Sequence, residues 1–83
     1  MAKPQHSHGY QPVRLLLHQM RETAGLTQRQ LASKLKRGQP YIHKSEVGTR
    51  RVDCFEFAEW CRACNADPVE QFRTIFGQHR DRQ

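Results

Sequence analysis

The chain has 83 residues, which leaves room for one domain, and its hydrophobic content of 36% is low but sufficient for a small core. Its longest unbroken apolar run, residues 15–17, is far too short to cross a membrane, and residues 1–12 contain no hydrophobic segment of a signal peptide. Three cysteines cannot all pair within one molecule, so we expect reduced thiols and a cytoplasmic location.

The formal net charge is +6, and it is unevenly distributed along the chain. Residues 1–51 contain ten Lys or Arg and two acids, a balance of +8, whereas residues 52–83 contain four Arg and six acids, a balance of −2. A surface that only keeps a protein soluble seldom separates the signs so strongly. We interpret the N-terminal half as a surface for an anionic partner.

Residues 1–10 lack helical periodicity and are predicted to form a flexible N-terminal arm. A first helix is predicted to begin at Gln11-Pro12, because a first helical turn tolerates proline, and to end before Gly25. Its apolar residues recur at helical spacing, at Val13, Leu16, Leu17 and Met20.

Two short helices with a basic turn between them are predicted next. Thr27 and Gln30 have the spacing of a capping box, so a second helix runs from there to about Leu35. The turn at residues 36–38 leads to a third helix over residues 39–47, again with proline in its first turn. The expected inward side chains of this pair are Leu31, Ala32, Leu35 and Ile42.

Two further helices complete the predicted bundle. Asp53 caps a fourth helix that runs to about Cys64, and Asn65 suits the left-handed residue after it. Asp67-Pro68 opens a fifth helix, and residues 78–83 are predicted to form a flexible tail. Five short helices without a strand signal predict an all-α fold, a compact bundle with its domain at residues 11–77.

Residues 27–48 therefore have the order of a helix-turn-helix. In that motif the first helix crosses the DNA backbone and the second enters the major groove with its N-terminal end. Small polar groups that start the first helix would meet phosphate, and the early outward residues of the second would reach bases. The first group is Thr27, Gln28 and Arg29, and the second is Gln39, Pro40, His43 and Lys44.

The same stretch resembles the phage-repressor/Cro (XRE-type) helix-turn-helix family, over roughly residues 12–76. The matching positions are Gly25-Leu26-Thr27-Gln28, Leu31-Ala32, Gln39, Tyr41-Ile42, Lys44, Glu46, Gly48, Arg50-Arg51, the helix at 53–65 and Asp67-Pro68. The resemblance implies a lambda-repressor-like fold and binding of double-stranded DNA.

By this resemblance Gln28 is expected to bind phosphate, while Gln39, Pro40 and Lys44 are expected to face the bases. The loop at residues 49–51 is expected to contact the DNA backbone or a neighbouring base. The full set of expected phosphate contacts is Thr27, Gln28, Arg29, Lys36, Arg37, Tyr41, Thr49, Arg50 and Arg51.

The chain departs from the family pattern at two places. Lys36-Arg37 stands where the family usually has glycine and an apolar residue, and Ser45 stands where it usually has an apolar anchor. These changes could loosen the recognition helix, or they could recruit the turn for extra phosphate contacts. We favour the second interpretation because both turn residues are cationic.

Cysteines and histidines raise the alternative of a zinc site. Cys61 and Cys64 fall within one predicted helix, with Cys54 on the same face, whereas structural zinc sites need four ligands and usually include a turn outside the helix. We expect three core thiols and no metal or cofactor. A specific role for His6 and His8 is not expected, and His43 could donate to DNA or only be solvated.

The aromatic side chains Phe55, Phe57 and Trp60 are expected in the core or at the edge of an interface.

No arrangement of catalytic residues appears at motif spacing, so an enzyme is not expected. The sequence favours a transcriptional regulator, a repressor or autoregulator, that binds a near-palindromic operator as a homodimer. An alternative is an antitoxin or another module that binds a protein partner, and RNA binding is a third possible function.

The expected dimer interface is the apolar face of the fifth helix, and the competing interpretation is that this face only covers Trp60 and the first helix. Its residues are Val69, Phe72, Ile75 and Phe76.

Overall fold

The computed structural model describes residues 9–77 of the chain. This part contains five α-helices and no strand: α1 (Gln11–Thr23), α2 (Gln28–Leu35), α3 (Gln39–Val47), α4 (Cys54–Ala63) and α5 (Pro68–Phe76). The predicted all-α bundle is confirmed. The expected tail at residues 78–83, and residues 1–8 of the expected arm with His6 and His8, lie outside the described residues.

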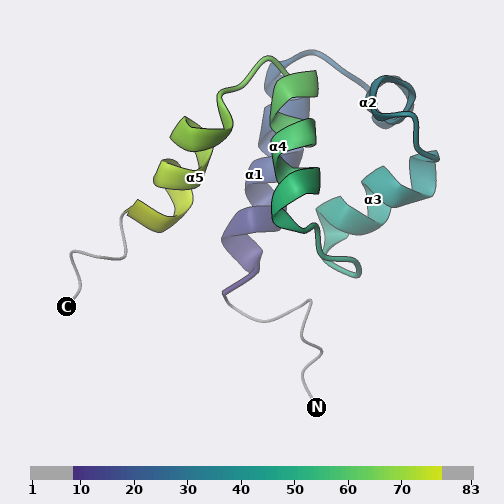
Figure 1. Ribbon diagram of the computed structural model, residues 1–83. Helices are drawn as coiled ribbons and strands as arrows, with labels where there is room; N and C mark the ends of the chain where they lie inside the picture. Colours follow the sequence, from purple (N-terminus) through teal and green to yellow (C-terminus); the bar gives the residue numbers. More distant parts are fainter. Residues whose placement is uncertain (1–8, 78–83) are drawn as a thin grey trace.

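Helices α1 and α4 lie against each other at the centre of the molecule (Figure 1), and α2 and α3 pack on one side of them. Helix α5 lies on the other side, where it contacts α4. The indole N–H of Trp60 donates to the carbonyl oxygen of Leu17 at 3.1 Å, so its polar atom is paired inside the core. The side chains of the core that are 0% exposed include Leu17, Leu31, Ile42, Trp60 and Cys61.

Side-chain caps begin three of the helices where the sequence predicts them. At α2 the Thr27 hydroxyl oxygen accepts from the backbone N–H of Gln30 at 3.0 Å, and the Gln30 amide oxygen accepts from the backbone N–H of Thr27 at 2.8 Å. Asp53 and Glu56 repeat this reciprocal pattern at α4, with distances of 2.7 and 2.9 Å. Asp67 accepts a backbone N–H at the start of α5. Because such caps pair the N–H groups that a helix leaves open, they fix where each helix begins.

Helix α2 ends in a left-handed residue that carries a side chain. Lys36 has φ of 58°, although a residue with a Cβ pays roughly 1–2 kcal/mol for this conformation. Asn65, after α4, has φ of 60°, as its position in the sequence predicts. The turn before α3 is therefore closed without glycine at its left-handed position.

Ser45 is 0% exposed although its side chain is polar. Its hydroxyl donates to the carbonyl oxygen of Tyr41, one turn earlier in α3, at 2.7 Å. Serine can therefore replace the apolar residue expected at this position, because its buried hydroxyl is hydrogen-bonded.

Two side chains, Cys54 and Tyr10, differ from the sequence-based expectation, and the position of a third, Phe55, is narrowed. Cys54 is exposed, because the first turn of α4 faces an open groove, so only Cys61 and Cys64 are core thiols. Phe55 was expected in the core or at the edge of an interface; it is 69% exposed, so it does not belong to the core. Tyr10 was expected in the arm but is buried. Its hydroxyl oxygen accepts from the backbone N–H of Val52 at 3.1 Å, and this bond holds the side chain against the loop before α4.

Candidate nucleic-acid interface

The N-terminal half of α3 presents an exposed polar face. Gln39, Pro40, His43 and Lys44, the four residues expected to contact bases, are all exposed there. Gly38 caps this helix in an extended conformation without a side-chain bond, and proline follows in the first turn. Because the capping residue is glycine, no side chain of the cap covers the start of α3.

Below this face, a buried ion pair connects α3 to α1. Arg21 donates from Nε to one oxygen of Glu46 at 2.6 Å and from Nη2 to the other at 3.1 Å. The third donor, Nη1, bonds the carbonyl oxygen of Leu26 at 2.8 Å. Glu46 is 4% exposed, and Arg21 is 9% exposed. The pair is bidentate, so it fixes the orientation of α3 relative to α1 more closely than a single hydrogen bond would.

Two more side chains complete the coordination of Glu46. His18 Nδ1 lies 2.9 Å from one carboxylate oxygen, and Gln28 Nε2 donates to the same oxygen at 3.2 Å. Burial would raise the pKa of Glu46, but the hydrogen bonds from Arg21, His18 and Gln28 outweigh it and hold the pKa below its usual range. Glu46 is therefore a buried anion that joins α1, α2 and α3.

Gln28 links this buried network to the exposed face. Its Oε1 lies 3.5 Å from Nε2 of Gln39, the first residue of α3, at the long limit for a hydrogen bond. The expected phosphate ligand and an expected base ligand are thus neighbours in space although they belong to different helices.

The flank of α3 next to α4 carries a second group of charged residues. The guanidinium carbons of Arg37 and Arg50 lie 4.4 and 4.6 Å from the centroid of the Tyr41 ring. Both side chains reach the carboxylate of Glu56, with N–O distances of 3.5 and 3.1 Å. We call Arg37, Tyr41, Arg50 and Glu56 the Glu56 cluster. It brings together three of the expected phosphate ligands and one acid that sequence analysis did not single out.

The remaining expected phosphate ligands lie around these two groups. The Thr27 oxygen accepts the cap hydrogen bond, and the Thr49 hydroxyl lies 3.4 Å from the carbonyl oxygen of Lys44. The guanidinium carbon of Arg51 lies 5.2 Å from the centroid of the Tyr10 ring. The exposed members of this remainder are Thr27, Arg29, Lys36, Thr49 and Arg51.

The cysteines do not form a metal centre within residues 9–77, where no group of three or more His, Cys, Asp or Glu side chains is arranged to hold an ion. Burial raises the pKa of both Cys61 and Cys64 to about 11, so these thiols stay protonated at neutral pH. They fill space in the core as small apolar groups.

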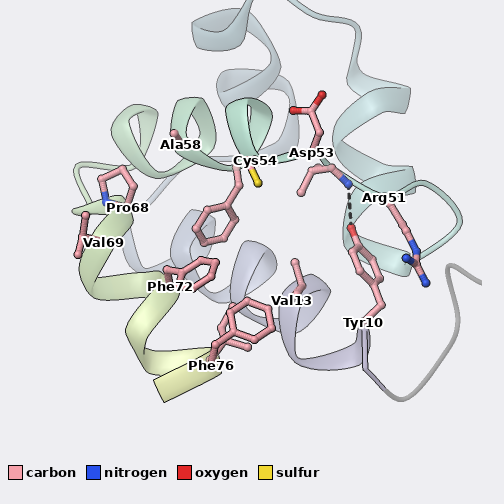
Figure 2. Close-up of a pocket in the computed structure, with 13 residues that line it drawn as sticks. Tyr10, Val13, Arg51, Asp53, Cys54, Ala58, Pro68, Val69, Phe72 and Phe76 are labelled. Carbon is pink, nitrogen blue, oxygen red and sulfur yellow. Dashed lines mark hydrogen bonds between the residues drawn. The ribbon is translucent and has the colours of Figure 1, made fainter. Parts of the chain in front are cut away.

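A groove of about 450 Å³ lies between the first turn of α4, the start of α1 and helix α5 (Figure 2). Phe72 and Phe76 line it with their ring centroids 4.6 Å apart. Val69, Phe72 and Phe76 are exposed, whereas Ile75 is buried beneath them. Of the four residues expected at a dimer interface, three are therefore exposed on the surface, and the fourth belongs to the interior.

One short helix, a tight turn and a second short helix with an exposed polar start define the class of protein as helix-turn-helix. A family model described as "Helix-turn-helix domain" matches residues 13–72. A solved structure, the XRE-family like protein from Pseudomonas syringae pv. tomato str. DC3000, is similar to this chain with a TM-score of 0.80 and 36% identity, over 84% of this chain and 85% of that chain.

The chain belongs to the XRE-type helix-turn-helix family. No match was found among curated proteins. Membership of this family supports a DNA-binding regulator rather than an enzyme. Within residues 9–77, every helix is too short or too polar to span a membrane.

Proposed function

We propose that this protein is a sequence-specific regulator of transcription, a repressor or autoregulator, that reads the major groove with α3 and acts in the cytoplasm. The observation that carries the proposal is the exposed polar start of α3, held in place by the buried Arg21–Glu46 pair. A helix that enters the major groove N-terminus first presents its early outward side chains to the base edges, and a fixed helix keeps those side chains in place.

Each residue on that face has chemistry that suits a base edge. Gln39 can pair with adenine through two hydrogen bonds, and Lys44 can donate to the acceptors of guanine. Pro40 has no donor and suits the methyl group of thymine, while His43 can donate to a base or a phosphate. The backbone would be held at the start of α2 by Thr27, Gln28 and Arg29, and beside α3 by Lys36, Arg37, Tyr41, Thr49, Arg50 and Arg51.

The working form in this proposal is a two-fold dimer that contacts itself through α5. A single recognition helix reads only a few base pairs, which is too little to select one site in a genome. Val69, Phe72 and Phe76 leave an apolar surface beside the groove. The half of the chain that contains them carries a charge of −2, so two copies would repel less there than through the half that carries +8. A two-fold dimer requires a near-palindromic operator.

Selection of bound sequences from random duplex DNA tests this proposal directly. We expect an enriched motif with two related half-sites whose centres are about one duplex turn apart. Recovery of no motif from duplex DNA, with the protein folded, would contradict sequence-specific binding.

The apolar groove also favours a second candidate, a module that binds a protein partner, for example an antitoxin. In that case the residues beside α5 would bind a toxin, and DNA binding would be secondary. Co-purification of a toxic partner that protects Phe72 and Phe76 would favour this candidate. Tight binding of palindromic DNA by the chain alone favours the first.

A further inference from the structure

The Glu56 cluster connects both ends of the recognition helix to α4. Arg37 comes from the turn before α3, Arg50 comes from the loop after it, and Tyr41 belongs to its first turns. Glu56 belongs to the first turn of α4, and its residue is 8% exposed. One carboxylate therefore holds two segments that bracket the helix expected to read DNA.

Arg50 uses most of its donors inside the protein. Its Nη1 donates to the carbonyl oxygen of Arg51 at 2.9 Å and to Glu56 Oε1 at 3.2 Å, while Nη2 donates to Glu56 Oε2 at 3.1 Å. A guanidinium has five N–H groups, and three of them are engaged here. The hydrogen bonds from Arg50 also lower the pKa of Glu56, which keeps the carboxylate charged. Arg50 is thus held against α4 by its hydrogen bonds, although its side chain is 39% exposed.

Arg37 is held much less tightly. The contact of its guanidinium with Glu56, Nη2 to Oε2 at 3.5 Å, is longer than an ordinary N–H···O hydrogen bond. Its guanidinium is stacked over the Tyr41 ring, and the side chain is 36% exposed. Stacking and a distant carboxylate orient this cation but leave donors available for another anion.

We infer that Glu56 is a positioning residue for DNA binding, which fixes Arg50 and Tyr41 so that Arg37 is held ready to meet a backbone phosphate. Arg50 then supports the contact instead of making it. The inference rests on the proposed DNA-binding function and revises one part of it, because Arg50 changes from a phosphate contact to a support for Arg37. The gain is preorganisation, since a long cationic side chain that is already ordered loses less freedom when it binds.

Glu56→Gln is the informative substitution because it removes the charge and keeps the shape. Glutamine at this helix position can still cap the helix, as Gln30 does for Thr27 at the start of α2. Binding of the selected duplex is measured over a range of salt concentrations. We expect affinity about three- to tenfold lower than for the wild type, from the lost order of one or two side chains, with the same salt dependence. Glu59→Gln, which removes the same charge from the same helix, should bind like the wild type.

Arg37→Gln separates positioning from general stabilisation. We expect this variant to bind more weakly and to lose about one unit of the logarithmic salt slope, because one phosphate contact is missing. Adding Glu56→Gln to it should then have little further effect. An equal loss in both backgrounds would mean that Glu56 only stabilises the fold, and would overturn the inference.

Other results would also overturn it. Tighter binding by Glu56→Gln with a steeper salt dependence would mean that the carboxylate only repels DNA phosphates.

Nitrogen-15 relaxation of the Arg37 guanidinium in the free protein provides a readout without DNA. We expect the guanidinium to be ordered in the wild type and mobile in Glu56→Gln, and equal mobility would contradict positioning. If the wild type binds no duplex, the proposed function fails and the inference fails with it. If the wild type binds and Glu56→Gln binds equally well, only the inference fails.

Discussion

Arg21 and Glu46 lie 25 residues apart in the sequence, and their side chains form two hydrogen bonds of 2.6 and 3.1 Å between α1 and α3. The carboxylate also receives His18 and Gln28, so every part of this buried charge is paired. Because Gln28 in turn approaches Gln39 on the surface, the pair connects the stability of the fold to the face proposed to read bases.

Replacing Arg21 with methionine should strongly destabilise the protein, because Glu46 would stay buried without its main counter-ion. Loss of one partner of a buried pair costs about 3–5 kcal/mol, and the remaining bonds from His18 and Gln28 favour the lower end. Urea unfolding measures the change. The double variant Arg21→Met with Glu46→Leu should recover much of the loss, and an equally unstable double variant would contradict this account.

Stability should also depend on pH through Glu46. Its pKa is lowered in the folded state, so the unfolded chain binds protons more readily and the stabilisation is present only above the unfolded value. As the pH falls below the ordinary carboxyl value of 4.5 and through the folded value, this contribution should disappear. Thermal unfolding at a series of pH values tests this, and Glu46→Gln should show a flatter profile than the wild type.

Gln39→Ala and Lys44→Ala should each weaken binding to the preferred DNA site by about 1–3 kcal/mol and relax the choice of base. Arg51→Ala serves as the comparison, because loss of a phosphate contact should weaken all sequences alike and reduce the salt dependence. Competition between the selected site and a scrambled duplex gives both quantities. Unchanged selectivity in both alanine variants would show that the recognition face has been assigned to the wrong residues.

Lys36→Gly should stabilise the protein by about 1 kcal/mol, because glycine adopts the left-handed conformation at the end of α2 without the steric cost of a Cβ. For a domain of this size the Tm should rise by roughly 4–8 °C. Lys36→Ala removes the same charge but keeps the Cβ, so it should bring no such gain. Equal Tm values for the two variants would assign the effect to charge rather than to backbone conformation.

Phe72→Glu should produce a folded monomer that binds half-sites weakly, because a charge would be buried in the proposed contact between two α5 helices. Sedimentation measures the oligomeric state, and a titration with palindromic DNA measures cooperativity. Phe55→Glu is a matched control, since Phe55 is also exposed but does not line the groove. A wild-type chain that stays monomeric at high concentration and binds without cooperativity would remove the dimer from the proposal.

The helix boundaries could be predicted because their causes are local. Thr27, Asp53 and Asp67 cap helices by bonding backbone groups two or three residues away, so the pattern is visible in a short stretch. The same holds for Asn65, whose left-handed conformation follows from its side chain. The exposed face of α3 also follows from helical periodicity alone.

The contacts that hold the site were not predictable in the same way. Arg21 and Glu46 meet only because α1 and α3 cross, and a single arginine on an amphipathic helix is usually solvated. An arginine directly after the buried Met20 is the one signal that could have drawn attention to the pair. Tyr10 was missed for a related reason, since its partner is a loop 42 residues further along the chain.

The complete burial of Trp60 has an optical consequence. It is the chain's only tryptophan, it is 0% exposed, and its indole N–H is bonded to a backbone carbonyl of α1. Its fluorescence emission should therefore lie at short wavelength in the folded protein and move to longer wavelength when α1 separates from α4. Because the ring has no contact with solvent, titration with DNA should leave this emission nearly unchanged, and the signal reports on folding alone.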